Sequence, residues 1–212
     1  PLERNKLARQ EPIVYLDYAG SALPTRSQLQ SILLLNQDVV FGNPHSSGPA
    51  ASHTKHLMEQ ANNRILTHFC AHGTADGDHP GYEILFTSGA TEACRIVAER
   101  FPWQPNSKLI YALESHTSIV GMRGSDGTTV AQFIAEPMET LLQDQNYWRD
   151  HHQNACCNNN NNNNLLVVPL ECNFGGDRYN VEQIFQRLLL LPNTFYTMLD
   201  MAKAASTGPV NL

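Results

Sequence analysis

The sequence predicts an α/β protein with a mostly parallel sheet flanked by helices. Short apolar segments of strand length alternate with longer segments whose apolar residues recur at helical spacing. This alternation is typical of a parallel, doubly wound sheet. A turn of small residues, Thr87 to Thr91, joins one predicted strand to a helix, and polar residues follow several other strands. Open α/β sheets bind their ligands at such positions.

Two helices are predicted before the first strand. Thr25 and Gln28 have the spacing of a capping box, which starts a helix that Gly42 would end. Residues 43–49 are rich in Gly, Pro and Ser, and they therefore predict a loop. A long second helix follows this loop, because apolar residues recur at helical spacing from Leu57 to Phe69.

The predicted strands of the remaining chain are residues 82–87, 108–112, 129–134, 165–169 and 195–200. A helix from Ala90 to Phe101 follows the first of them, and Pro102 ends this helix. A short helix begins near His116, and Asn180 caps a further helix before the last strand.

We expect one domain from residue 13 to residue 212, preceded by a loose polar segment, residues 1–12. One part of this domain has a different composition. Asn158–Asn164 is an unbroken asparagine run, which has nothing to bury. Residues 144–164 are therefore predicted to form a disordered insertion.

The composition argues against two classes of partner. The chain has 212 residues, a net charge of −6 and 14 scattered lysines and arginines, so it lacks the basic stripe expected of a nucleic-acid-binding protein. It has no apolar run near the ~18 residues of a membrane helix, which argues against a membrane partner. Its five cysteines include no CxxC pair, which favours reduced thiols. We therefore expect a soluble, cytoplasmic protein.

The small-residue turn is a candidate phosphate site. Backbone N–H groups at a helix start lack internal partners and carry a partial positive charge. Gly89 and Ala90 let an anion approach this backbone closely, and Ser88 and Thr91 add hydroxyl donors. The turn therefore predicts a cradle for a phosphorylated ligand. Small residues at a strand–helix turn are common, so this pattern alone is weakly specific.

Three polar side chains after predicted strands suit an aromatic ring. A carboxylate at Asp200 favours a protonated pyridinium nitrogen. The imidazole of His116 can stack on a ring, and the amide of Asn173 can hydrogen-bond a ring oxygen. Each residue also has a structural interpretation, since a single histidine is commonly structural and Asp200 could cap a helix. Their joint placement, in this order, favours a bound ring.

Two other kinds of site are disfavoured. His151, His152, Cys156 and Cys157 are candidate metal ligands, but adjacent pairs in an asparagine-rich tract lack the spacing of a structural zinc site. We therefore expect no metal. No GxGxxG motif follows a predicted strand, which argues against a dinucleotide-binding unit.

Several motifs resemble the class V aminotransferase family, whose fold the cysteine desulfurases share. The motifs that carry this resemblance are residues 16–20, 42–46, 86–92, 99–103, 115–123, 172–176 and 199–207, within a stretch from about Ile13 to Leu212. Inside the family, Phe101-Pro-Trp103 and His116 to Arg123 are similar to the amino-terminal domain of the molybdenum cofactor sulfurase branch. The resemblance implies the type I fold of transferases that depend on pyridoxal 5′-phosphate.

By this resemblance, a small set of residues would bind pyridoxal 5′-phosphate. Ala90 and Thr91 would hold its phosphate, and His116 would stack on its ring. Asn173 would approach the ring oxygen, and Asp200 would approach the ring nitrogen.

The resemblance also implies that part of the enzyme lies outside these motifs. Family members form a Schiff base with a lysine well after the strand that ends at Asp200. Lys203 stands too early for this role, at a position where the desulfurases have glutamine. We therefore assign no catalytic residue in this chain, and we expect the sheet to be incomplete at its C-terminal end.

The implied activity is the mobilisation of sulfur from L-cysteine and its transfer to the molybdenum cofactor. The family's fold commonly forms homodimers, so a homodimer is a possible assembly. Two alternatives stay open. The chain could be a catalytically inactive fragment or pseudoenzyme, or it could belong to a general cysteine desulfurase.

Overall fold

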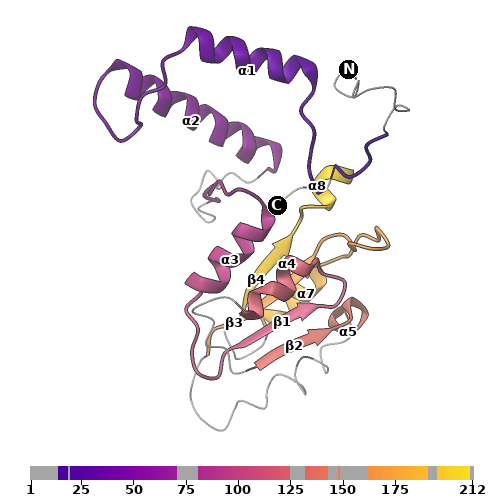
Figure 1. Cartoon of the computed structure of the whole chain (residues 1–212). Helices are drawn as coiled ribbons and strands as arrows, with labels where there is room; N and C mark the ends of the chain where they lie inside the picture. The colour runs from indigo at the N-terminus through magenta and orange to yellow at the C-terminus, as the bar shows by residue number, and fades with distance from the viewer. Residues whose placement is uncertain are drawn as a thin grey trace. The chain divides into compact units, whose positions relative to one another are not determined.

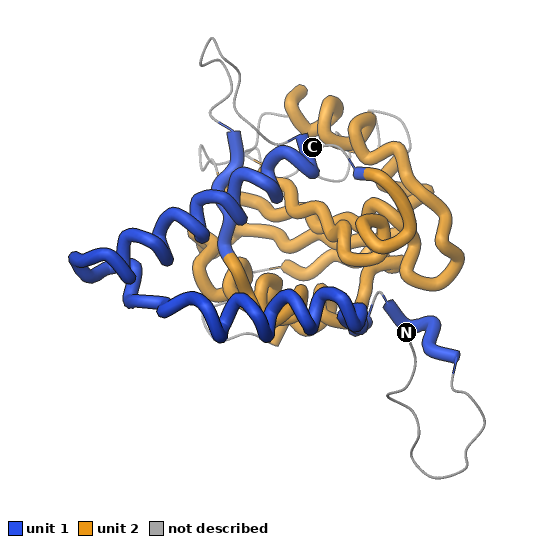
Figure 2. The backbone as a smooth tube through the Cα atoms, turned by 90° about the horizontal axis from the view of Figure 1, so that it is seen from above, with its two compact units in different colours: residues 1–85, 210–212 blue, residues 86–209 orange. Residues whose placement is uncertain are grey.

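The computed structural model describes residues 14–18, 20–70, 81–124, 132–142, 148, 162–190 and 195–210. The chain forms two compact units, which Figure 2 colours separately: unit 1 is residues 1–85 with 210–212, and unit 2 is residues 86–209. Within the described residues, unit 1 contains only helices as regular structure, and unit 2 contains the sheet. The predicted domain boundaries at residues 13 and 212 stay a prediction.

Unit 1 contains the helices α1 (Arg26–Asp38) and α2 (Pro49–His68). The predicted capping box is confirmed, because the Gln28 N–H donates to Thr25 Oγ1 at 3.2 Å and the Thr25 N–H donates to Gln28 Oε1 at 2.7 Å. α1 ends earlier than predicted, since Val39 already has extended backbone angles, which suit its β-branched side chain. Within the described ranges, every helix is too short or too polar to span a membrane.

Unit 2 is built on a parallel sheet (Figure 1). Its strands are β1 (Lys108–Ala112), β2 (Gln132–Glu136), β3 (Asn164–Pro169) and β4 (Phe195–Asp200), in the order β2-β1-β3-β4. Each pairing in this order is parallel. The predicted α/β class with a mostly parallel sheet is therefore confirmed.

Helices cover both faces of this sheet. They are α3 (Ala90–Arg100), α4 (Thr117–Gly121), α5 (Met138–Leu142) and α7 (Glu182–Leu188), with a 3-10 turn at Met122–Gly124. A further short helix, α8 (Ala204–Thr207), follows β4. Side chains alternate along a strand. On one face, Leu109 and Tyr111 of β1 pack with residues of α3 and α4. On the other, Ile110 and Ala112 pack with residues of α5 and α7. β1 is therefore the buried centre of a two-sided core.

Besides α1, three predicted elements differ from the observed ones. No strand forms at residues 82–87, because a strand needs a hydrogen-bonded neighbour and the described strands of the sheet pair only with one another. The helix before β4 begins after Val181 rather than after Asn180. The strand predicted at residues 129–134 extends to Glu136, and residues 129–131 lie outside the described residues.

The end of the asparagine run is structured, unlike the disordered insertion predicted at residues 144–164. Asn164 is the first residue of β3 and is only 4% exposed, and its Oδ1 accepts the Lys108 N–H at 3.0 Å. Trp148 is fully buried in the core, and its Nε1–H donates to the Leu141 carbonyl at 3.1 Å. The ordered structure therefore includes part of the predicted insertion, while residues 144–147 and 149–161 lie outside the described residues.

The contribution of Asn164 can be measured. We expect Asn164→Ala to lower the free energy of unfolding by about 1–3 kcal/mol, because the Lys108 N–H loses a buried acceptor. Urea unfolding followed by circular dichroism gives this value. Asn180→Ala removes an exposed asparagine that caps no helix, so it serves as the control and should cost less than about 0.5 kcal/mol. Equal effects of the two substitutions would contradict a structural role of Asn164.

Candidate functional site

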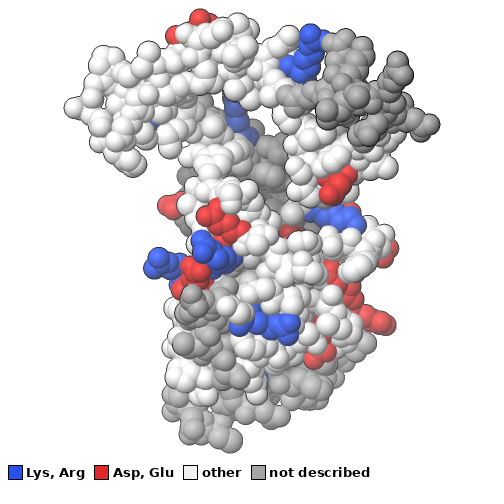
Figure 3. All heavy atoms as spheres, viewed as in Figure 1, with Lys and Arg blue, Asp and Glu red and all other residues white. Residues whose placement is uncertain are grey.

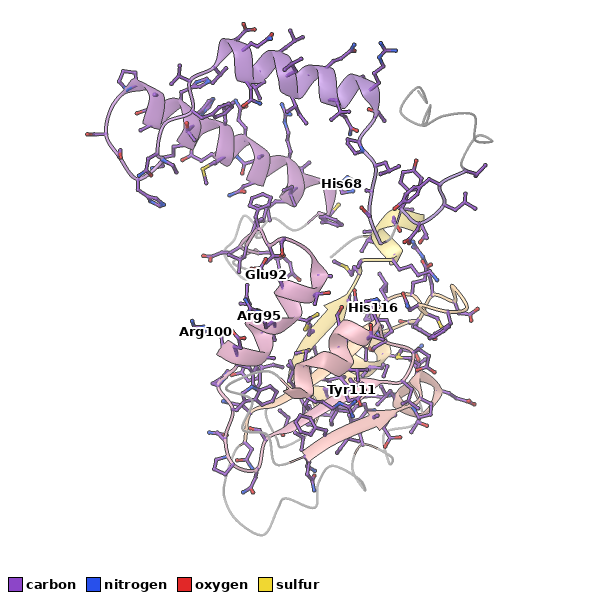
Figure 4. All side chains as sticks on the ribbon, in the orientation of Figure 1. His68, Glu92, Arg95, Arg100, Tyr111 and His116 are labelled. Carbon is purple, nitrogen blue, oxygen red and sulfur yellow. The ribbon has the colours of Figure 1, made fainter. Side chains whose placement is uncertain are left out.

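Three of the predicted site residues lie at the carboxyl end of the sheet in unit 2. Asp200 is the last residue of β4 and pairs in register with Pro169, the last residue of β3. Asn173 follows β3, and His116 follows β1 as the N-cap of α4 (Figure 4). Parallel neighbours end at the same edge of a sheet, so these three loops share one rim.

Backbone hydrogen bonds join the loops at this rim. The Asn173 N–H donates to the Glu114 carbonyl in the loop after β1, at a long 3.5 Å. The Leu170 N–H donates to the Asp200 carbonyl at 2.9 Å, which joins the ends of β3 and β4. The Glu114 carboxylate accepts the Met138 N–H at 2.9 Å and so attaches the same rim to α5. The loops that carry the predicted residues are therefore held together.

The start of α3 has the features of the predicted anion cradle. Its N-cap Gly89 makes no side-chain cap, and a Cβ built at Gly89 would meet no atom within 4 Å. Ala90 and Thr91 are exposed, so the first N–H groups of α3 face open space. The Glu92 carboxylate accepts the Ser88 N–H at 2.6 Å, and this bond lowers the pKa of Glu92. Glu92, labelled in Figure 4, thus links the first turn of α3 to the residues directly before the helix.

Ser118 joins this cradle to His116. Its hydroxyl lies 2.8 Å from Thr91 Oγ1 and 2.8 Å from His116 Nδ1. The Ser118 N–H also donates to His116 Nδ1 at 3.2 Å. Nδ1 is therefore an acceptor, which leaves the ring proton of the neutral imidazole on Nε2. Sequence reasoning gave Ser118 no role, although a hydroxyl two residues after a helix-capping histidine was a usable signal.

The Asp200 carboxylate is placed between β4 and α3. Its Oδ1 accepts the Ala202 N–H at 3.0 Å. Burial, together with the negative charge of Asp200, raises the pKa of Cys94 on α3 to about 11. The charge of Asp200 therefore acts on the Cys94 thiol of α3. The interpretation of Asp200 as a helix cap is wrong, since Lys203 is the N-cap of α8.

The turn after β3 has its own bonding pattern. Cys172 is 7% exposed, and its Sγ accepts the Gly175 N–H at 3.2 Å. This bond is the largest cause of a lowered pKa at Cys172, and further N–H groups of the turn and the Tyr179 hydroxyl add to it. Burial, followed by the hydrogen bond to Cys172, raises the pKa of Tyr179. The turn that carries Asn173 is therefore compact.

A buried carboxylate anchors the segment that follows β4. Glu171 is 5% exposed, and its Oε2 accepts hydrogen bonds from the Thr207 hydroxyl and, at 3.3 Å, from Arg178 Nε. Arg178 also donates to the carbonyls of Ala204 and Pro209 at 2.9 and 3.0 Å. The Thr207 bond is the main cause of a lowered pKa at Glu171. We call these bonds among Glu171, Arg178 and Thr207 the clamp. Sequence reasoning missed the clamp, because its partners lie far apart in the chain.

The donor set fits a phosphorylated aromatic ring. Open backbone and a hydroxyl stand at the start of α3, and an imidazole, an amide and a carboxylate stand at the same sheet edge. On the face of unit 2 seen in Figure 3, acidic and basic side chains are interspersed. Among the residues that the structure describes, no group of three or more His, Cys, Asp or Glu could hold a metal. The disfavoured ligands at residues 151–157 lie outside the described residues.

The lowered pKa of Glu171 predicts acid sensitivity. Its ionised form stabilises the fold above the ordinary carboxyl pKa of 4.5, and this contribution disappears as the pH falls through the lowered value. We expect Glu171→Gln to cost about 1–3 kcal/mol in urea unfolding at about pH 7, and less at about pH 3. Glu139→Gln, at an exposed position of α5, is the control. A cost at Glu171 that is independent of pH would contradict the clamp.

The chain is similar to curated molybdenum cofactor sulfurases. It is 33% identical to the Homo sapiens protein over 225 residues and 29% identical to the Arabidopsis thaliana protein over 231 residues. These alignments cover 100% and 94% of this chain, but 24% and 27% of those proteins. The chain therefore spans about a quarter of the length of these relatives.

Solved structures share the fold at low identity. A NifS-like protein from Rickettsia africae matches with a TM-score of 0.66 at 18% identity, over 93% of this chain and 50% of that one. A cysteine desulfurase from Escherichia coli matches with a TM-score of 0.62 at 18% identity, over 92% and 46%. The cystine C-S lyase C-DES, solved with its product cysteine persulfide, matches with 0.65 at 15% identity, over 93% and 49%. The predicted fold is therefore confirmed.

The family is shown by a match over nearly the whole chain. The model of the family described as aminotransferase class-V matches residues 14–212, which include every predicted site residue. The sheet, its covering helices and the similarity to the sulfurases agree with this match. The chain belongs to the aminotransferase class-V family.

Proposed function

We propose that this chain is part of a molybdenum cofactor sulfurase, which uses pyridoxal 5′-phosphate to take sulfur from L-cysteine and pass it to the molybdenum cofactor. The observation that carries the proposal is the gathering of His116, Asn173 and Asp200 at one sheet edge, with Thr91 joined to His116 through Ser118. The similarity to named molybdenum cofactor sulfurases favours this function over that of a general cysteine desulfurase.

The start of α3 would hold the cofactor phosphate. The N–H groups of Ala90 and Thr91 are the first of the helix, where the helix dipole favours an anion. The open space at Gly89 leaves room for phosphate oxygens next to the backbone. The Thr91 hydroxyl would add a further donor. The exposed position of this turn supports the assignment.

The rim residues would hold the ring. The Asp200 carboxylate would keep a proton on the ring nitrogen, since an opposite charge favours the protonated form. His116 would stack on the ring with its orientation set by Ser118, and the Asn173 amide would donate to the ring oxygen. When bound, pyridoxal phosphate supplies an electron sink for the substrate amino acid. The residues of this chain thus bind and orient the ring and keep it protonated.

The role of Asp200 predicts a loss of binding in its neutral variant. We expect Asp200→Asn to weaken the binding of pyridoxamine 5′-phosphate about tenfold or more, because a charge-assisted hydrogen bond is lost. Isothermal titration calorimetry measures this affinity. This probe has no aldehyde, so it cannot form imines with surface lysines. Asp38→Asn, at the end of α1, is the matched control.

The activity itself is tested by the release of alanine. The longer protein of which this chain is proposed to be a part, supplied with pyridoxal phosphate and L-cysteine, should release alanine, and its Asp200→Asn variant should release much less. A protein that binds neither phosphorylated pyridine would contradict the cofactor assignment. A protein that binds them but releases no alanine would instead favour the catalytically inactive alternative.

Ser118 provides a second test of the same site. We expect Ser118→Ala to remove the hydroxyl bond to Nδ1 of His116 while the N–H of residue 118 still donates to it. The chemical shift of Nδ1 should therefore change, and pyridoxamine phosphate binding should weaken about threefold to tenfold. Nitrogen-15 NMR of labelled histidine reports this change at Nδ1 without any cofactor. Ser118→Thr should restore both properties, and Ser52→Ala, exposed on α2, should change neither. An unchanged His116 signal in Ser118→Ala would contradict the bridge.

A further inference from the structure

Lys203 joins the loop after β4 to the loop after β3. Its Nζ donates to the Cys172 carbonyl at 2.8 Å and to the Asn173 carbonyl at 3.1 Å. Its side chain is half-buried, and it lies close enough to Glu171 for the two charges to attract each other. A single ammonium thus holds two consecutive peptide groups of the turn that carries Asn173.

The ammonium is presented from an anchored segment. Lys203 is the N-cap of α8, and its own carbonyl accepts the Ser206 hydroxyl at 2.7 Å. Arg178 fixes the same short helix through the Ala204 carbonyl at 2.9 Å, and Arg178 is itself paired with buried Glu171. The position of Nζ is therefore set by the fold rather than by a freely rotating side chain.

Lys203 adds to the bonds that this turn makes within itself. Asn173 is exposed, and within the described residues its N–H makes only a long bond to the Glu114 carbonyl, at 3.5 Å. A lysine ammonium has three donors and a positive charge, and hydrogen bonds from charged donors are stronger than neutral ones. A glutamine at position 203 would be shorter and uncharged, so it could not hold both carbonyls with the same strength.

We propose that Lys203 is a positioning residue that fixes the turn of residues 172–176, so that the Asn173 side chain is presented at the rim of the site. This inference rests on the proposed function, because Asn173 needs to be positioned only if it contacts the cofactor. It also explains why a lysine near Asp200 need not bind the cofactor covalently, since its ammonium is engaged by two carbonyls.

The first readout needs no cofactor. Cys172 belongs to the same turn and is 7% exposed, so loosening the turn should expose its thiol. We expect Lys203→Met to increase the rate of Cys172 alkylation by iodoacetamide about fivefold or more, measured on the Cys172 peptide by mass spectrometry. Cys94, which is 3% exposed on α3, should stay protected in the same sample and so reports any general unfolding.

The second readout is binding of pyridoxamine 5′-phosphate, which we expect Lys203→Met to weaken about tenfold. Lys203→Arg keeps the charge and the donors, so it should restore slow alkylation and most of the affinity. Lys55→Met, at an exposed position of α2, should alter neither readout.

The two ideas fail in different ways. Unchanged Cys172 alkylation in Lys203→Met, equal exposure of Cys94, or unchanged probe affinity would overturn the positioning role. A wild-type protein that does not bind the probe would overturn the proposed function and, with it, the use of Asn173 at the rim. The alkylation readout would then still decide whether Lys203 holds the turn.

Discussion

The parallel pairing of β1, β3 and β4 is the constraint on which the site depends. The β3–β4 ladder runs in register from Asn164 and Phe195 to Pro169 and Asp200, and β1 pairs with the other side of β3. Both faces of these strands are packed against helices, so a shift by one residue would turn buried side chains towards the wrong face. The core therefore fixes where each strand ends, and the strand ends fix where the polar residues begin.

Side-chain hydrogen bonds orient the residues that the sheet brings to one edge. The sheet brings loops to one edge, but it does not set the orientation of an imidazole or an amide. Ser118 does this for His116, and Lys203 does it for the turn of Asn173. The clamp of Glu171 and Arg178 in turn holds the segment that carries Lys203. The arrangement is hierarchical: a packed core, then buried polar contacts, then exposed residues available to a ligand.

Local patterns predicted much of this structure. The strands at 108–112 and 195–200 and the capping box at Thr25 are confirmed, because each depends on nearby residues. The gathering of His116, Asn173 and Asp200 was also predictable, since polar residues after parallel strands meet at one edge. The bridges of Ser118 and Lys203 were not, because they join residues 27 and 30 positions apart. The prediction of a strand at 82–87 failed for a similar reason, because an apolar pattern indicates burial but does not identify a strand to pair with.

The buried asparagines at the start of β3 give the end of the asparagine run a structural role without setting its length. Asn162 and Asn164 are buried, and Asn164 already occupies a ladder position opposite Phe195. All residues of the run are asparagine, so the gain or loss of one gives the same sequence wherever it occurs, and asparagines still occupy the positions directly before Leu165. Repeat-length changes, to which homopolymeric codon runs are prone, therefore leave the register of β3 unchanged. The sheet thus requires asparagine at the end of the run without specifying how many asparagines precede it.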